Sequence, residues 1–165
     1  METNFKNRKK IRDNEFINQE FEGNLELPNC KKIGKQAFLN CKFTGILELP
    51  NCEEIGDYAF YNSKFQGTLY APKLKKIGKG AFLNSTMLKN LYLPSLKEAG
   101  ENAFELFISV DNVITIGQKA KLGKNWISKN DKKNNAFLNE YNNTGKKGGV
   151  YKYMWRMENW KYQKK

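Results

Sequence analysis

The apolar positions of this chain recur every 22 residues. Each unit opens with an L-x-L segment and continues through a proline, an apolar residue followed by glycine, and an Ala-Phe pair. The phenylalanine column shows how constant the spacing is: Phe38, Phe60, Phe82 and Phe104. A fixed period in the low twenties with alternating leucines predicts a solenoid of stacked coils. We therefore interpret most of the chain as one repeat solenoid.

Each L-x-L segment predicts a short strand. Leu25 and Leu27 are two residues apart, so their side chains point to the same side of an extended chain. One strand per coil gives a parallel β-ladder, and the proline that follows ends each strand because it has no N–H to donate. We expect a fifth strand at Val113–Ile116, in register with the others. Two further columns are expected to face the core: Ile33, Ile55, Ile77 and Ala99, each before a glycine that permits a bend, and Phe21, Phe43, Phe65 and Met87.

Polar residues also recur in columns. Asparagine occupies one of them: Asn18, Asn40, Asn62 and Asn84. Stacked amides satisfy backbone groups at turns, and we prefer this structural interpretation to a binding role. Charges change sign from coil to coil in the columns that begin at Lys31, Lys32 and Lys35. Opposite charges on neighbouring coils help to fix the register.

The two ends of the chain differ from the repeats. Ile11 and Phe16 fit the apolar columns one period before the first full coil, so residues 9–18 are the second half of a truncated coil. We divide the chain into an N-terminal half-repeat cap (1–18), the solenoid (19–117) and a basic, aromatic C-terminal module (118–165). In this module residues 131–142 predict a helix with three apolar residues on one face: Ala136, Phe137 and Tyr141. With a strand from Val150 to Trp155, the helix would form a small α/β cap.

Composition adds one feature to this picture, which is an uneven charge. The chain has 165 residues and a formal net charge of +12. Residues 1–118 hold 16 Lys and Arg against 14 Asp and Glu, a net of +2, whereas residues 119–165 hold 13 against 3, a net of +10. A basic segment attracts polyanions such as nucleic acid or anionic lipid, and the alternative is that its lysines serve solubility.

The sequence also bears on location. No stretch is long and apolar enough to span a membrane. No apolar signal segment lies near the N-terminus, which favours a cytoplasmic location. A secreted or surface location is the alternative if an export signal precedes this sequence.

Nothing in the sequence indicates catalysis or a bound metal. The chain has no histidine, which excludes Ser-His and Cys-His mechanisms, and it has no phosphate-binding loop and no C-x-x-C spacing. Cys30 and Cys52 share a column with Leu74 and Leu96, so we expect both to be buried, and a disulfide between them would be strained. We interpret them and Cys41 as free thiols. We expect no enzyme activity, no cofactor and no metal site.

The repeat pattern L-x-L-P-x-x-x-x-I-G-x-x-A-F, which runs from Leu47 to Phe60 and is completed by Asn40-Cys41, resembles the BspA-type leucine-rich repeats. The resemblance covers residues 9–117 and implies a leucine-rich-repeat right-handed coil without enzymatic activity. Many members of that family are secreted or surface-displayed in bacteria and protists and bind host proteins or other cells. A shorter stretch is similar to a module that follows the repeats in some bacterial members: Phe137, Tyr141, Gly145, Gly149, Val150, Tyr151 and Trp160.

The outward residues of the ladder are the first candidate site. They change from acidic to aromatic along the stack, whereas structural columns repeat one residue type. The predicted partner-binding residues are Glu26, Glu48, Tyr70, Tyr92, Asn90, Ile46 and Thr68, and the same columns contain Asn24, Asn112 and Ile114. Exposed tyrosines on a rigid strand are typical interface anchors, although Tyr and Thr also suit β structure in general. We expect the partner to be another protein.

The basic tail is the second candidate site. The predicted polyanion-binding residues are Lys146, Lys147, Lys152, Arg156, Lys161, Lys164 and Lys165. One side of the predicted strand carries Tyr151, Tyr153 and Trp155. These rings could stack on bases, or they could cover the last coil as a cap, which is the interpretation we prefer. The corresponding second hypothesis is a small intracellular inhibitor or regulator of a nucleic-acid enzyme or ribonucleoprotein. Such a protein would be encoded by a mobile element and act in the manner of an anti-CRISPR protein.

Overall fold

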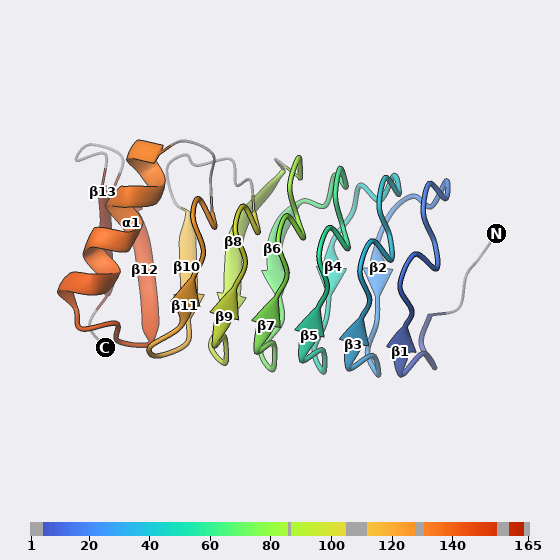
Figure 1. The fold of residues 1–165 in the computed structure, drawn as a ribbon, viewed down its shortest axis with the longest axis horizontal. Helices are drawn as coiled ribbons and strands as arrows, with labels where there is room; N and C mark the ends of the chain where they lie inside the picture. Colours follow the sequence, from blue (N-terminus) through green and yellow to red (C-terminus); the bar gives the residue numbers. More distant parts are fainter. Residues whose placement is uncertain (1–4, 86, 105–111, 128–130, 155–158, 164–165) are drawn as a thin grey trace.

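The computed structural model describes residues 5–85, 87–104, 112–127, 131–154 and 159–163. The chain forms a solenoid whose coils lie side by side in a row, with the N-terminal half coil at one end and a helix with two strands at the other (Figure 1). Each coil contributes one strand to each of two parallel ladders. The predicted repeat solenoid with a small C-terminal α/β cap is therefore confirmed.

The larger sheet has seven strands and contains the predicted L-x-L ladder. Its strands are β2 (Leu25–Glu26), β4 (Leu47–Glu48), β6 (Gly67–Tyr70), β8 (Leu88–Leu93), β10 (Val113–Ile116), β12 (Gly149–Met154) and β13 (Asn159–Gln163). The strands from β2 to β10 are parallel, and β12 and β13 add to the same sheet in antiparallel orientation. The cap thus extends the sheet of the solenoid.

The smaller sheet has six strands, and the sequence pattern did not predict it as a sheet. Its strands are β1 (Lys10–Ile11), β3 (Lys32–Ile33), β5 (Glu54–Ile55), β7 (Lys76–Ile77), β9 (Glu98–Ala99) and β11 (Lys121–Leu122). Their apolar residues do face the core, as predicted. Two residues per strand are too few for an alternating pattern to be recognised.

Two stacks of phenylalanine rings fill the core between the sheets. Phe60 lies between Phe38 and Phe82, with ring centroids 5.3 and 5.1 Å apart. Phe43 and Phe65 form the second stack at 5.2 Å, and its rings meet those of the first edge to face. Met87 was expected to continue the second stack, but its side chain is 46% exposed, and the neighbouring Leu88 is buried instead. The cause is a register irregularity, because Leu88 pairs with Gly67 only 21 residues earlier.

The fifth coil departs from the 22-residue register. Ile114 pairs with Leu91 and Thr115 with Tyr92, a spacing of 23. The prediction that Ile114 and Asn112 point outward is therefore wrong, since both are buried. The additional residue falls between Phe104 and Asn112, because Phe104 still pairs with Phe82 at a spacing of 22.

The glycine column serves close stacking rather than a bend. Gly56 has no positive φ. A Cβ atom added there would lie 2.6 Å from the backbone nitrogen of Lys35 in the preceding coil, closer than real Cβ contacts allow. Positive φ angles occur instead in the asparagine column, for example 59° at Asn40 and 61° at Asn62, a conformation that asparagine tolerates better than most residues. They also occur in a second column, with 53° at Gln36 and 55° at Tyr58. Within this column the amides bond to each other, since Asn40 Nδ2 donates to Asn18 Oδ1 at 2.9 Å.

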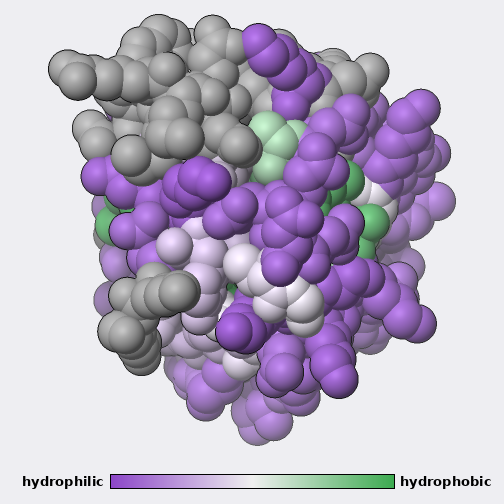
Figure 2. Space-filling model, turned by 90° about the vertical axis from the view of Figure 1, so that its left-hand side faces the viewer, coloured by the Kyte–Doolittle hydropathy of each residue, from purple (hydrophilic) through white to green (hydrophobic). Residues whose placement is uncertain are grey.

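Aromatic residues close both ends of the stack. At the N-terminal end Phe5 is buried against Phe16, Phe21 and Phe38. At the C-terminal end Trp126 takes the backbone position of the alanine column, since its carbonyl accepts from the N–H of Phe104 as that of Ala103 does from the N–H of Phe82, and its ring meets Phe104 edge to face at 6.2 Å. Helix α1 (Asp131–Asn143) packs Phe137 against Trp126. Seen from that end, the described surface is largely hydrophilic (Figure 2). The helix and strand predicted for the tail are present, and Trp155 lies outside the described residues.

Phe60→Ala should destabilise the solenoid by about 3–5 kcal/mol, because it removes a fully buried ring and leaves a cavity between Phe38 and Phe82. Urea denaturation followed by circular dichroism measures the free energy of unfolding. Lys97→Ala, at an exposed position, is the control and should change it by less than about 0.5 kcal/mol. A loss below about 1 kcal/mol for Phe60→Ala would contradict the column packing.

Candidate functional site

The outer face of the seven-stranded sheet carries the exposed aromatic pair of the predicted site. Tyr70 and Tyr92 are neighbours on β6 and β8, and their side chains are 47% and 39% exposed. Their rings are stacked with centroids 5.2 Å apart and planes within 8° of parallel. They are exposed because Leu69 and Leu91, one residue before, point into the core. Ile46, on the segment leading into β4, is also 43% exposed.

The polar residues beside the tyrosines hold neighbouring coils together. Asn90 Nδ2 donates to Thr68 Oγ1 at 3.3 Å, and Asn90 Oδ1 accepts a hydrogen bond from the backbone N–H of Val113 at 2.8 Å. Asn24 accepts one from the N–H of Ile46 at 2.9 Å. Because Asn90 uses both ends of its amide within the sheet, its contribution to this face is structural. Thr68 remains exposed.

The N-terminal end of this face is acidic. Glu26 and Glu48 are exposed and lie opposite each other on β2 and β4. Glu48 in turn lies opposite Tyr70 on β6. The predicted residues of the strand face thus lie together on one surface, in the order acidic then aromatic.

The structure also brings part of the basic tail to the same face. Lys152 on β12 lies opposite Val113 on β10, and Lys161 on β13 lies opposite Lys152. Both neighbours of Lys152, Tyr151 and Tyr153, are buried, so Lys152 occupies an outward position of the sheet. Sequence reasoning treated the strand face and the tail as separate sites. The alternation of residues 150–155 was visible, but not the strand with which it would pair.

The remaining basic residues are distributed over other surfaces. Lys146 and Lys147 are exposed on the loop between α1 and β12. The Lys161 ammonium lies 3.8 Å from Glu140 of α1. Arg156, Lys164 and Lys165 lie outside the described residues.

The tail aromatics in the described residues belong to the cap. Tyr151, Tyr153 and Trp160 are buried, so the idea that the tail tyrosines stack on bases is wrong for these residues. The Tyr151 hydroxyl donates to the carbonyl of Lys147 at 2.9 Å and pairs with Thr144 at 2.8 Å. Burial raises the pKa of both Tyr141 and Tyr151.

All three cysteines are free thiols, as predicted, and Cys41 is buried along with Cys30 and Cys52. Burial raises the pKa of Cys41 to about 11 and that of Cys52 to about 12, and it also raises the pKa of Cys30. The Cys41 thiol donates to the carbonyl of Phe16 at 2.9 Å. Since the thiolate is the reactive form, none of these cysteines has the character of a nucleophile.

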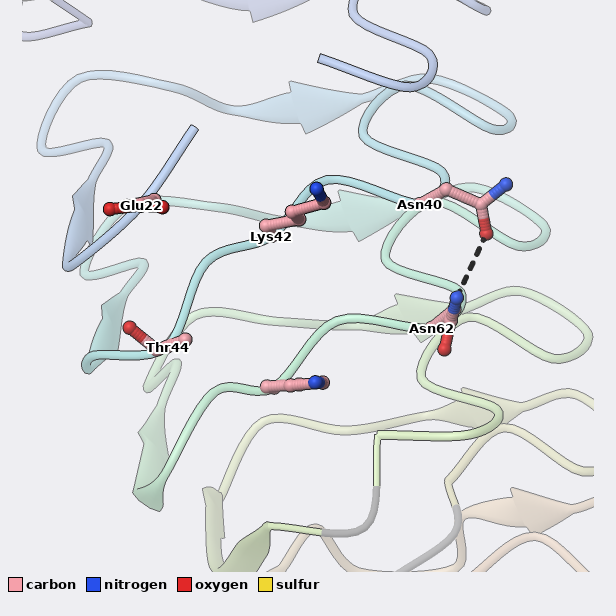
Figure 3. Close-up of a pocket in the computed structure, with 6 residues that line it drawn as sticks. Glu22, Asn40, Lys42, Thr44 and Asn62 are labelled. Atoms are coloured by element: carbon pink, nitrogen blue, oxygen red, sulfur yellow. Dashed lines mark hydrogen bonds between the residues drawn. The ribbon is translucent and has the colours of Figure 1, made fainter. Parts of the chain in front are cut away.

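A shallow, open groove lies beside the asparagine column. It has a volume of about 460 Å³ and is lined by Glu22, Asn40, Lys42, Thr44, Asn62 and Lys64. Its side chains lie around the rim without converging, and Asn62 donates to Asn40 at 3.3 Å (Figure 3). Lys42 pairs with Glu20 at 2.7 Å, outside this set. The arrangement is that of a surface hollow between structural columns.

Two further properties concern metals and membranes. Within the described ranges, no group of three or more Cys, Asp or Glu side chains is placed to hold a metal ion. In the same part of the chain, no helix has the length and apolar character that crossing a bilayer requires.

Comparison with known proteins identifies the class. Residues 9–138 match the BspA type leucine rich repeat region in six copies, so the chain belongs to this family. A leucine-rich-repeat domain is typically a protein-binding module and generally non-catalytic. No curated protein and no solved structure matches the chain. The match extends beyond residue 117, in agreement with a fifth coil that continues to Trp126, whose carbonyl accepts a hydrogen bond from the N–H of Phe104 at 2.7 Å.

Thiol labelling tests the cysteine environment. At pH 8 the folded protein should react slowly with a maleimide or aromatic disulfide reagent at all three cysteines, because burial excludes the reagent and the raised pKa values keep the thiols protonated. Between pH 8 and 10 the labelling rate at Cys41 and Cys52 should rise about tenfold per pH unit without levelling off, because the thiolate fraction grows in that proportion below pKa values of about 11 and about 12. Denatured but unreduced protein should show all three thiols, and a smaller number would refute the assignment.

Proposed function

We propose that this chain is a non-enzymatic module that binds another protein through the outer face of its seven-stranded sheet. The single observation that carries the proposal is the exposed, stacked pair Tyr70 and Tyr92. Tyrosine offers a large contact area with few rotatable bonds, so ordering it in an interface costs little entropy. A pair that is already stacked loses still less freedom when a partner covers it.

The distribution of apolar surface supports this location. Of the four exposed large hydrophobic residues in the described part of the chain, three lie on this face: Ile46, Tyr70 and Tyr92. Apolar groups gathered on one exposed surface are typical of interaction sites, whereas single scattered ones need no explanation. The sheet below them is anchored by ladder hydrogen bonds on both sides, so the surface is rigid.

A purely structural account of the tyrosines makes a different prediction. Aromatic pairs on neighbouring strands stabilise sheets by roughly 0.2–1 kcal/mol, and this alone could favour tyrosine at both positions. Under that account, removing the pair would lower stability and leave association with a partner unchanged. The two accounts are therefore separable by measuring stability and binding in the same variant.

Tyr70→Ala combined with Tyr92→Ala should weaken partner binding at least tenfold and lower the free energy of unfolding by less than about 1 kcal/mol. The partner is first captured by a photo-crosslinking amino acid at position 70 in cells of the source organism, with the same amino acid at the exposed position 97 as background. Binding of the identified partner is then measured by calorimetry. Tyr58→Ala with Tyr61→Ala, an aromatic pair with centroids 6.2 Å apart away from this face, is the matched control. Normal binding by the Tyr70/Tyr92 variant would place the site elsewhere.

The exposure of Lys146 and Lys147 supports a second candidate function, in which the tail contacts nucleic acid as part of a regulator or inhibitor. Phosphate contacts by lysines release counterions, so such binding weakens steeply with salt.

Replacing Lys146, Lys147, Lys161, Lys164 and Lys165 by Gln should lower the salt concentration at which the protein elutes from heparin and abolish weak retention on single-stranded DNA. The five lysines carry half of the net charge of +10 in residues 119–165, so the electrostatic attraction falls accordingly. Circular dichroism checks that the fold is intact. Unchanged elution would remove the tail from consideration.

A further inference from the structure

We propose that the strand face and the lysines of the cap form one continuous recognition surface, which takes a protein segment that is cationic at one end, apolar in the middle and anionic at the other. This inference rests on the proposed function and specifies the chemistry of its partner. The surface is named here the bipolar face. It consists of Glu26, Glu48, Ile46, Tyr70, Tyr92, Thr115, Val113, Val150, Lys152 and Lys161.

Strand pairing makes the bipolar face continuous across the junction between solenoid and cap. Thr115 lies opposite Tyr92, so the tyrosine row passes from β8 to β10. Val150 lies opposite Thr115, and Lys152 opposite Val113, which carries the surface onto β12. The alternate residues on each of these strands are buried, among them Ile114, Ile116 and Tyr151.

Charge is ordered along this face. The two carboxylates occupy β2 and β4, and the two lysines occupy β12 and β13 at the other end of the sheet. At a strand spacing of about 4.8 Å, Glu48 and Lys152 are four strands and roughly 19 Å apart, and Glu26 and Lys161 are six strands and roughly 29 Å apart. An extended peptide advances about 3.3 Å per residue, so it spans these distances with roughly six to nine residues.

The outward charges of the smaller sheet are arranged differently, although Lys10 on β1 lies opposite Lys32 on β3. There the outward residues alternate in sign from β3 to β11, and ion pairs form between them, as at Lys32 and Glu54, 2.8 Å apart. On the bipolar face Glu26 lies opposite Glu48 and Lys152 opposite Lys161. Like charges on neighbouring strands destabilise a sheet, so a cationic segment over Glu26 and Glu48 relieves the repulsion between them.

The same surface is unsuited to nucleic acid and to a second copy of the chain. Glu26 and Glu48 repel phosphates, and the tyrosine rings are stacked on each other, so no ring pair is open to receive a base. Two copies would each carry a net charge of +12 and repel each other. A protein segment can match both signs locally without a large net charge. The Lys161 side chain is 43% exposed and lies 3.8 Å from Glu140, a long contact that leaves its ammonium accessible to a partner's carboxylate as well.

A phage-displayed library of random 16-residue peptides tests the inference without knowledge of the natural partner. The library is selected on the full chain and depleted on the Tyr70→Ala, Tyr92→Ala variant. Selected peptides should carry Lys or Arg at one end and Asp or Glu at the other, separated by roughly six to nine residues that include aromatic or aliphatic side chains. Synthetic versions are then titrated in solution.

Charge variants show whether the pattern arises from this face. Lys152→Glu with Lys161→Glu should weaken a selected peptide at least fivefold, and so should Glu26→Lys with Glu48→Lys. All four changes together should restore binding, because the peptide can lie in the opposite direction. Lys146→Glu with Lys147→Glu, the matched control off the face, should change affinity less than twofold. Should the glutamate variants fail to fold by circular dichroism, Lys152→Gln with Lys161→Gln replaces them, with a two- to threefold loss expected.

The outcomes separate this inference from the proposed function. Peptides without paired charges, or insensitivity to the lysine and glutamate variants, overturn the bipolar face and leave a tyrosine-centred site standing. A selection that yields no binders, or one in which depletion on the tyrosine variant removes every binder, overturns both. A 20-nucleotide single-stranded DNA whose binding is lost in Lys152→Gln with Lys161→Gln but retained in the Lys146, Lys147 variant would assign the face to nucleic acid. A dimer in sedimentation that the lysine variant dissolves would assign it to a second copy.

Discussion

The structure depends on one constraint, which is that each coil buries its apolar side chains only against the coils before and after it. Phe60 illustrates this, because its ring is covered by Phe38 on one side and Phe82 on the other. Side chains that face the column must therefore repeat, and the backbones must approach closely enough for the rings to touch. The glycine column follows from the same requirement, since a Cβ at Gly56 would collide with the backbone of the previous coil.

A stack of this kind has two open ends, and each end needs a residue set that does not repeat. At the first coil Phe5 covers three phenylalanines, and Arg8 lies over the ring of Phe16 while pairing with Glu15. At the last coil Phe137 of α1 covers Trp126, and the Tyr141 hydroxyl accepts a hydrogen bond from the N–H of Ala120 at 2.8 Å. The cap thus satisfies a backbone group of the final coil as well as its apolar surface.

The sequence was most informative where the columns repeat, and least where single residues are inserted. The phenylalanine column, the free cysteines and the alternating charges follow from positions 22 apart, so they could be predicted. Met87 and Ile114 could not be placed correctly from the sequence. A bulge displaces Met87 and one additional residue displaces Ile114, and both irregularities are visible only in the hydrogen-bond register. The shared face of Tyr92 and Lys152 was missed for a related reason. Antiparallel pairing of β12 with β10 joins residues 33 to 39 positions apart that have no periodic relation.

The outward columns are free to vary for function, because their side chains do not pack against the neighbouring coils in the core. On the smaller sheet and the turns beside it, outward residues of neighbouring coils often carry opposite charges that stabilise the stack. Lys79 and Glu101, for example, are 3.2 Å apart. The outward residues of the larger sheet do not follow this pattern. Glu26 lies opposite Glu48, and the large rings of Tyr70 and Tyr92 remain exposed. Both sheets run along the same row of coils, yet it is the larger one that leaves two aromatic rings exposed side by side. Departures from local stability rules concentrate at functional sites, and the exposed tyrosine pair and the facing glutamates lie together on the larger sheet.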